Sequence, residues 1–202
     1  MYIPKLNCFD NPDEVFSFME EHNFATVVTA RHNIPSATQL PVILGKRDGS
    51  VIITAHFAKA NSQWEDIENE NVLVLFNGPH AYISPKNYET PLNVPTWNYL
   101  SVHAYGKGEI IRETTAVFKI LEATIDVYEP KYKGQWDGIP NDYKLKLVQG
   151  IVAFEITVTD LQAKKKLSQN RSKVEQQTII ETLGKSPVDR EQEIGRLMKK
   201  IW

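Results

Sequence analysis

Apolar and polar residues alternate through much of residues 24–112, and this period of two is typical of strands that bury one face. Turn-forming residues at 32–35 and at Asp48-Gly49 favour hairpins, and Gly78-Pro79 indicates a further turn. The pattern predicts a sheet of about six or seven mostly antiparallel strands. We expect these strands over residues 24–30, 36–44, 50–55, 72–76, 81–84, 97–112 and 151–158.

Helical spacing and capping residues mark the other segments. Asn11 begins a capping pattern that is followed by an apolar stripe, and similar patterns stand at Ser172 and Ser186. Strands in the centre with helices at the ends predict an α+β barrel rather than an alternating βαβ fold. Residues 132–140 are predicted to form a loop long enough to act as a lid. We expect helices over residues 11–22, 58–68 and 114–128, and two more within residues 172–202.

Composition places the chain among ordinary folded proteins. It has 202 residues, of which 42% are hydrophobic and 24% charged, which excludes a disordered tail protein or a coiled coil. The net charge of -2 hides an asymmetry, because residues 1–160 carry 13 basic against 20 acidic residues and residues 161–202 carry 10 against 5. The basic tail could meet phosphate, but the chain lacks the overall charge of a constitutive DNA-binding protein.

Compartment and metal chemistry follow from what the sequence lacks. No apolar run approaches the roughly 20 residues that cross a bilayer, so no membrane association is expected. Cys8 is the single cysteine, and neither a CxxC nor an HExxH spacing occurs, so we expect no zinc site or other metal. A reducing cytoplasm is the expected location.

The first candidate cluster lies where a strand runs into a short helix, at residues 54–61. Small residues there allow a ligand close to the backbone, and His56 and Lys59 add a donor and a charge that would suit a phosphate. The alternative to a phosphate site is an ordinary turn with a surface lysine. A second cluster, residues 78–85, places His80, Tyr82 and Ser84 on one face of a strand, either as a ligand wall or as packing with a capping serine.

Two further clusters follow along the chain. Within residues 94–106, aromatic and polar side chains alternate on one strand face, which could stack a flat ring or form a subunit contact. Residues 164–171, KKKLSQNR, lead into a capped helix and offer amide and guanidinium donors, although runs of charge are usually solvated. The sequence contains no nucleophile–base spacing and no P-loop, which disfavours a covalent hydrolase or a kinase.

The segments HFAKANSQW, FNGPHAYISP, VPTWNYLSVHAYGKG and KKKLSQNR, in this order, resemble the PaiB family of FMN-binding negative transcriptional regulators. The likeness runs from Met1 to Leu183. It implies an FMN-binding split barrel that acts as a cytoplasmic homodimer with the flavin at the subunit interface. The chain departs from the family pattern at residues 86–88, where Lys-Asn-Tyr replaces Ser-Trp-Tyr, and at Ala153, where glycine is commoner. The first departure concerns the substrate side more than FMN.

The resemblance also implies a division of the chain and a set of cofactor contacts. Residues 1–170 would form the split-barrel domain, and residues 171–202 a helical extension packed on the barrel or on the partner. The implied contacts lie in a phosphate corner, beside the ribityl chain, near the flavin ring or opposite subunit, and in a closing segment. In that order they are Thr54, His56, Lys59 and Asn61; Tyr82 and Ser84; Thr96, Trp97 and Asn98; and Lys166, Gln169 and Asn170.

Two functions from different classes are open at this point. One is a flavin-binding regulator that lowers transcription of sporulation and degradative-enzyme genes, as the resemblance implies. The other is a flavin-dependent oxidoreductase, related to pyridoxamine-phosphate oxidases or flavin reductases, that moves electrons from reduced nicotinamide to a small acceptor; hydride transfer needs no general base. FMN is the expected cofactor, with haem held by a histidine as the alternative. Direct DNA binding is possible only through the basic tail.

Overall fold

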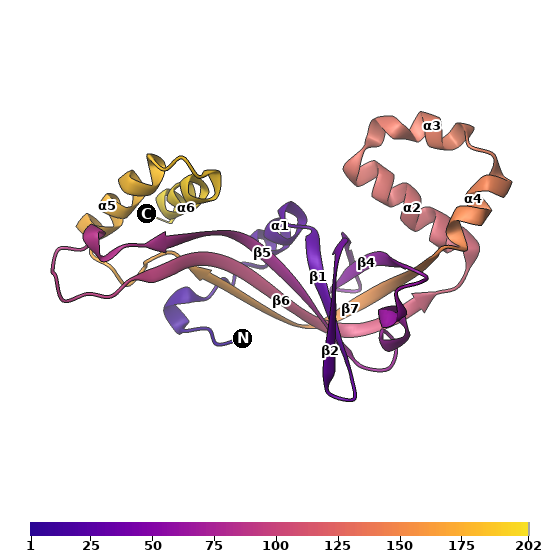
Figure 1. Cartoon of the computed structure of the whole chain (residues 1–202), viewed down its shortest axis with the longest axis horizontal. Helices are drawn as coiled ribbons and strands as arrows, with labels where there is room; N and C mark the ends of the chain where they lie inside the picture. The colour runs from indigo at the N-terminus through magenta and orange to yellow at the C-terminus, as the bar shows by residue number, and fades with distance from the viewer. Residues whose placement is uncertain (202) are drawn as a thin grey trace. The chain divides into compact units, whose positions relative to one another are not determined.

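The computed structural model describes residues 1–201, so residue 202 of the expected tail extension lies outside the described residues. Seven strands form one open sheet in the order β2-β1-β5-β6-β7-β4-β3, which confirms the predicted α+β fold class with its split-barrel sheet. Figure 1 labels these strands except β3. The paired neighbours β1–β2, β1–β5, β3–β4 and β4–β7 are antiparallel. The strands are β1 (Phe24–Arg31), β2 (Ile34–Pro41), β3 (Ile43–Arg47), β4 (Ser50–Ala58), β5 (Asn71–Ile83), β6 (Thr96–Ile111) and β7 (Ile151–Lys166).

Two tight hairpin turns fall where the sequence predicts them. His32 and Asn33 join β1 to β2 with φ of 51° and 66°, and Asp48 and Gly49 join β3 to β4 with φ of 51° and 79°. Left-handed backbone at both turn positions matches the right-handed twist of the flanking strands, and asparagine, aspartate and glycine tolerate it best. Local chemistry therefore fixes the register of both hairpins.

Strand limits differ from the predicted pattern in two places. The single strand expected over residues 36–44 is broken at Val42, which is fully buried and whose amide donates to the carbonyl of Asn23 at 2.8 Å. The turn expected at Gly78-Pro79 is wrong, because both residues lie within β5. β1 pairs with β5 at residues 73–75 of β5, and Pro79 lies beyond these residues of the same strand.

The helices are α1 (Pro12–Glu21), α2 (Thr114–Tyr128), α3 (Lys133–Gly138), α4 (Asn141–Val148), α5 (Lys173–Gly184) and α6 (Asp189–Lys200). Asn11 and Ser172 cap α1 and α5 as predicted. The predicted lid loop is wrong, because a 3-10 turn (η4, Pro130–Tyr132) and α3 occupy it and Trp136 is buried there. The helix expected over 58–68 is reduced to a five-residue 3-10 turn, η2 (Ser62–Asp66).

Backbone contacts divide the chain into two compact units. Unit 1 comprises Met1–Phe18, Asn77–Val102 and the chain from Gln162 onward, and unit 2 comprises Met19–Phe76 and His103–Leu161. In unit 1, α5 and α6 pack through fully buried isoleucines, with Gly195 of α6 close to Leu183 of α5. The expected domain boundary at residue 170 stays a prediction.

Unit 2 has its own aromatic core, which orients β4. Phe57 of β4 stacks on Phe154 of β7 with ring centroids 4.9 Å apart, and Ile53 and Ala55 are buried on the same side of β4. Thr54 and His56 therefore face the other side of the sheet. In residues 1–201, no helix is long and apolar enough to cross a membrane, and no cluster of three metal-ligating side chains occurs.

Candidate functional site

The expected phosphate corner lies at the end of β4 in unit 2. Thr54 and His56 are half-buried on the face opposite the core. Burial lowers the pKa of His56 below its ordinary value of 6.5, so the imidazole is neutral at pH 7. Lys59 follows with an exposed side chain, and its amide donates to the Gly150 carbonyl at 2.8 Å. The corner thus offers one exposed positive charge, one neutral imidazole and one hydroxyl.

Asn61 holds the turn that follows. Its side-chain oxygen accepts from the amide of Gln63 at 3.1 Å, and its side-chain nitrogen donates to the Thr38 hydroxyl at 2.9 Å. The amide of Gln63 at the start of η2 is therefore already capped. This short 3-10 turn does not provide the open helix N-terminus that the sequence suggested, so a phosphate would have to be met by side chains.

Beside Asn61 lies a cavity of about 510 Å³ in unit 2. Gln63 forms its floor: the buried side-chain amide donates to the carbonyls of Val27 and Ser36 at 3.0 and 3.1 Å and accepts from the Thr38 hydroxyl at 2.6 Å. Hydroxyls and amides dominate the lining, which comprises Arg31, His32, Ile34, Ser36, Ala37, Thr38, Asn61, Ser62, Gln63 and Asp66.

The volume and donor set of this cavity fit part of a hydroxylated, phosphorylated ligand such as FMN. At its rim, Arg31 binds Asp66 at 2.5 Å and Glu65 at 3.0 Å, so its charge is already offset. Of the predicted site residues, only Asn61 lines the cavity; the alternation of Ser36 and Thr38 along β2 is the sequence signal that could have indicated this polar face.

The second group of predicted residues lies in unit 1, on neighbouring strands β5 and β6. The Trp97 indole meets the Tyr82 ring edge to face at 5.9 Å and the His80 ring at 5.5 Å. Tyr82 and Trp97 are 47% and 50% exposed, whereas Ala81 and Ile83, which flank Tyr82 along β5, are buried. The predicted alternation is confirmed, and it leaves open aromatic surface.

Ser84, Asn98 and Gln169 are used within the fold. The Ser84 hydroxyl caps a short turn by accepting from the Lys86 amide at 3.3 Å. Asn98 is fully buried, accepts from the Ser168 hydroxyl at 3.1 Å and faces the sulfur of Met198 at 3.5 Å. The side chain of Gln169 bonds the backbone of residues 165 and 167. For these three, a role toward the cofactor stays a prediction.

The three lysines at the end of β7 each contact a partner within the fold. A run of charged residues usually forms a solvated surface instead. Lys164 is buried, donates to the Tyr2 carbonyl at 3.2 Å and lies 5.2 Å from the Tyr99 ring. Lys165 pairs with Glu14 at 3.1 Å. The Lys166 amine donates to the Thr96 hydroxyl, and burial lowers the pKa of this lysine.

The predicted residues thus fall into two groups. The group in unit 2 is Thr54, His56, Lys59 and Asn61, and the group in unit 1 is Tyr82, Ser84, Thr96, Trp97, Asn98, Lys166, Gln169 and Asn170. Within unit 1, the structure brings Thr96 to Lys166 and Tyr82 to Trp97; Asn170 is exposed, and Asn98 points inward. Sequence reasoning missed Thr38 and Gln63.

The class of protein follows from comparison with known families. Residues 1–160 match the family described as "Putative FMN-binding domain". Over 203 residues the chain is 40% identical to "Protease synthase and sporulation protein PAI 2" of Bacillus subtilis, covering 98% of this chain and 97% of that protein. The chain therefore belongs to the PaiB family of FMN-binding proteins, which confirms the resemblance, and FMN is its cofactor.

Solved structures confirm the fold at much lower sequence identity. The flavocytochrome Anf3 from Azotobacter vinelandii superposes with a TM-score of 0.60 at 16% identity, covering 77% of this chain and 67% of that one. A FAD and heme binding protein from Mycobacterium smegmatis gives a TM-score of 0.60 at 14% identity, with 77% and 71% covered. At this identity the likeness concerns the architecture alone.

Proposed function

We propose that this protein is a homodimeric, FMN-binding regulator of the PaiB type that lowers transcription of sporulation and degradative-enzyme genes. The observation that carries the proposal is the match over nearly the whole length to a relative named for protease synthesis and sporulation. Such a role places the protein in the cytoplasm, beside the genes it would regulate.

Dimerisation is supported by the aromatic surface of unit 1. Half-exposed Tyr82 and Trp97 form a patch of the residue types that protein interfaces favour. A second copy that covers this patch would remove it from water. We propose that a subunit interface also holds the flavin. The proposed phosphate contacts in unit 2 are Thr54, His56, Lys59 and Asn61, and the proposed ring contacts in unit 1 are Thr96 and Lys166.

Each of these residues has a role that its chemistry permits. Bound FMN would supply a redox-active ring to the site. Lys59 offers its ammonium group to the phosphate, and neutral His56 can donate one hydrogen bond without adding charge. Lys166, anchored on Thr96, presents an amine whose lowered pKa reflects the cost of desolvation.

The proposed regulator would not read DNA through its lysine run. Lys164 is buried and Lys165 is paired with Glu14, so neither is free to neutralise phosphates. Regulation would then depend on a partner or on the flavin state rather than on direct contact with a promoter.

The regulatory proposal is tested in Bacillus subtilis lacking its own PAI 2 protein. Expression of this chain should restore normal extracellular protease levels, and a Lys59→Ala variant with weakened FMN binding should restore them less. Unchanged protease levels with wild-type chain that is present and FMN-loaded would contradict the proposal. An absorption spectrum of the purified protein, before and after adding FMN or hemin, distinguishes flavin from haem as the bound group.

A flavin-dependent oxidoreductase is the second candidate, and one observation favours it. The open ring surface at Tyr82 and Trp97 could also receive a second flat ring, as transfer from a reduced nicotinamide would require. Anaerobic mixing of the FMN-loaded protein with NADH or NADPH decides between the two. Bleaching of the flavin band within seconds would support the enzyme, and a stable oxidised spectrum would support the regulator.

A further inference from the structure

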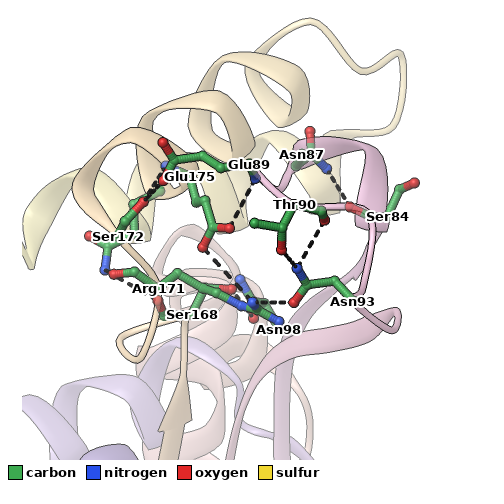
Figure 2. A network of polar contacts seen from close by, with 11 residues as sticks. Ser84, Asn87, Glu89, Thr90, Asn93, Asn98, Ser168, Arg171, Ser172 and Glu175 are labelled. Carbon is green, nitrogen blue, oxygen red and sulfur yellow. Dashed lines mark hydrogen bonds and ion pairs between the residues drawn. The ribbon is translucent and has the colours of Figure 1, made fainter.

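A network of polar contacts in unit 1 fastens the connection between β5 and β6 to the start of α5 (Figure 2). The Ser172 hydroxyl donates to a carboxylate oxygen of Glu89 at 2.7 Å, and the Glu89 amide donates to Glu175 at 3.1 Å. Farther along α5, the Thr182 hydroxyl donates to the side-chain oxygen of Asn87 at 2.8 Å. The loop is therefore bonded to α5 at more than one point along its length.

Arg171 is the centre of this network. Its guanidinium lies 3.7 Å from the centroid of the Tyr88 ring, donates to the side-chain oxygen of Asn93 at 2.7 Å and lies 3.9 Å from a Glu175 oxygen. The Arg171 side chain is 20% exposed and that of Glu175 is 10% exposed. A flat, forked cation suits stacking and donating at once, and a lysine ammonium cannot reproduce both contacts.

The loop and the segment that Arg171 joins both end at residues of the proposed flavin site. The loop begins after Ser84 and leads into Thr96 and Trp97, and the segment begins at Lys166. Between Lys166 and Arg171, Ser168 has a φ of 61°, a left-handed conformation that costs energy for a serine. It is retained because its hydroxyl bonds Asn98 and its carbonyl accepts from Gln176 at 3.2 Å.

We propose that Arg171 is a positioning residue for the flavin site, an inference that rests on the proposed site in unit 1. By holding the β5–β6 loop on the start of α5, it fixes where Lys166 meets Thr96 beside Trp97. It acts through those residues and makes no cofactor contact of its own. Its loss should therefore weaken binding by disordering the site, whether or not the ligand carries a phosphate.

The experiment compares the affinities of FMN and riboflavin by fluorescence quenching at a temperature where circular dichroism shows a folded protein. Arg171→Ala should lower the affinities for both ligands about tenfold and to the same degree, since misplacement of site residues lowers affinity without removing a phosphate contact. Arg171→Lys should fail to restore affinity. Arg196→Ala, which removes an exposed arginine paired with Glu193 on α6, is the matched control and should leave both affinities unchanged.

Two variants of Tyr88 provide the test if the arginine variants fail to fold. The Tyr88 hydroxyl is buried without a hydrogen-bond partner, so Tyr88→Phe keeps the stacking ring and should bind FMN normally, whereas Tyr88→Leu should lose affinity. A folded Arg171→Ala protein that binds FMN within twofold of wild type, or full rescue by lysine, overturns the inference. A lower melting temperature with unchanged affinity also overturns it, whereas wild-type protein that binds no flavin refutes the proposed site itself.

Discussion

The Tyr82 hydroxyphenyl ring and the Trp97 indole meet at an interplanar angle of 72°, from adjacent strands, with about half of each side chain exposed. Edge-to-face pairs of this kind are favourable, but a patch of two large aromatic rings is seldom left in water. The relationship between these two rings is the physical basis for expecting a partner on this face.

We predict that the protein is a dimer through this face. Light scattering should give twice the 23.1 kDa chain mass at micromolar concentration, and Trp97→Ser should weaken the dimer by about 2 kcal/mol or more, as is usual for a central interfacial tryptophan. Tyr143→Ser on α4 removes an equally exposed aromatic ring elsewhere and should leave the mass unchanged. A wild-type monomer would contradict the prediction.

Binding to DNA should be weak, and the lysine run should not account for it. Each phosphate contact adds about 0.9 to the slope of log affinity against log salt. Because Lys164 and Lys165 are engaged within the fold, replacing both with alanine should leave that slope unchanged, whereas replacing Lys199 and Lys200 in the last turn of α6 should flatten any slope present. Filter binding over a salt series measures this. Tight, salt-resistant and sequence-selective binding would favour a direct repressor.

Local signals in the sequence predicted the fold well because their chemistry is completed within a few residues. The caps at Asn11 and Ser172 and the turn at Asp48-Gly49 are of this kind. The dipeptide Gly78-Pro79 predicts a turn, but it lies within β5, because a strand accepts proline wherever the missing N–H faces no partner, which is a property of the sheet and not of the dipeptide.

The candidate site was predicted less completely for the same reason. Gln63 forms the floor of the cavity only because its amide reaches carbonyls of β1 and β2, which are 36 and 27 residues away in sequence, respectively. Lys164 is buried, and its amine donates to the carbonyl of Tyr2, 162 residues away in sequence. Partners so distant leave no mark on the pattern around either residue.

His56 should make stability depend on pH. Its pKa is lower in the folded protein than the ordinary 6.5, so below pH 6.5 the unfolded chain binds more protons and the free energy of unfolding falls until the folded-state pKa is passed. Burial also lowers the pKa of His103, so this residue changes the stability in the same direction. The urea concentration at the unfolding midpoint should fall between pH 7.5 and pH 5.5, and His56→Gln should make this fall smaller.

The control for this measurement is Glu68, whose pKa Arg112 lowers from 4.5 to about 2. The stability that Glu68 contributes is present above pH 4.5 and is lost only as the pH falls toward 2. Glu68→Gln should therefore leave the interval from pH 7.5 to 5.5 unchanged. An identical drop in wild type and His56→Gln would remove His56 as a cause.

Gly106 should tolerate no side chain. A Cβ at this position in β6 would lie 2.4 Å from the Thr157 carbonyl oxygen and 2.6 Å from a methyl group of Ile156. Because the first of these is backbone, the strands must shift, and Gly106→Ala should cost about 1 to 3 kcal/mol of unfolding free energy. Gly45→Ala in β3 meets nothing within 4 Å and is the matched control. Urea unfolding that gives equal midpoints for the two variants would contradict this packing.

Lys59 should separate recognition of the phosphate from recognition of the flavin ring. The charge of Arg31 is offset by Asp66 and Glu65, and the imidazole of His56 is neutral at pH 7, so the phosphate corner depends on the exposed ammonium of Lys59. A charge-assisted hydrogen bond contributes about 1.5 to 3 kcal/mol, so Lys59→Ala should lower the affinity for FMN roughly ten- to a hundredfold.

Riboflavin lacks the phosphate, and its affinity should hardly change in Lys59→Ala. Lys46→Ala, at another exposed lysine of unit 2, serves as the matched control and should alter neither affinity. Titration of both flavins against the three proteins by fluorescence quenching measures the difference. Equal losses for FMN and riboflavin would indicate general damage to the site, and an unchanged FMN affinity would remove Lys59 from it; only a loss confined to FMN assigns the phosphate to the end of β4.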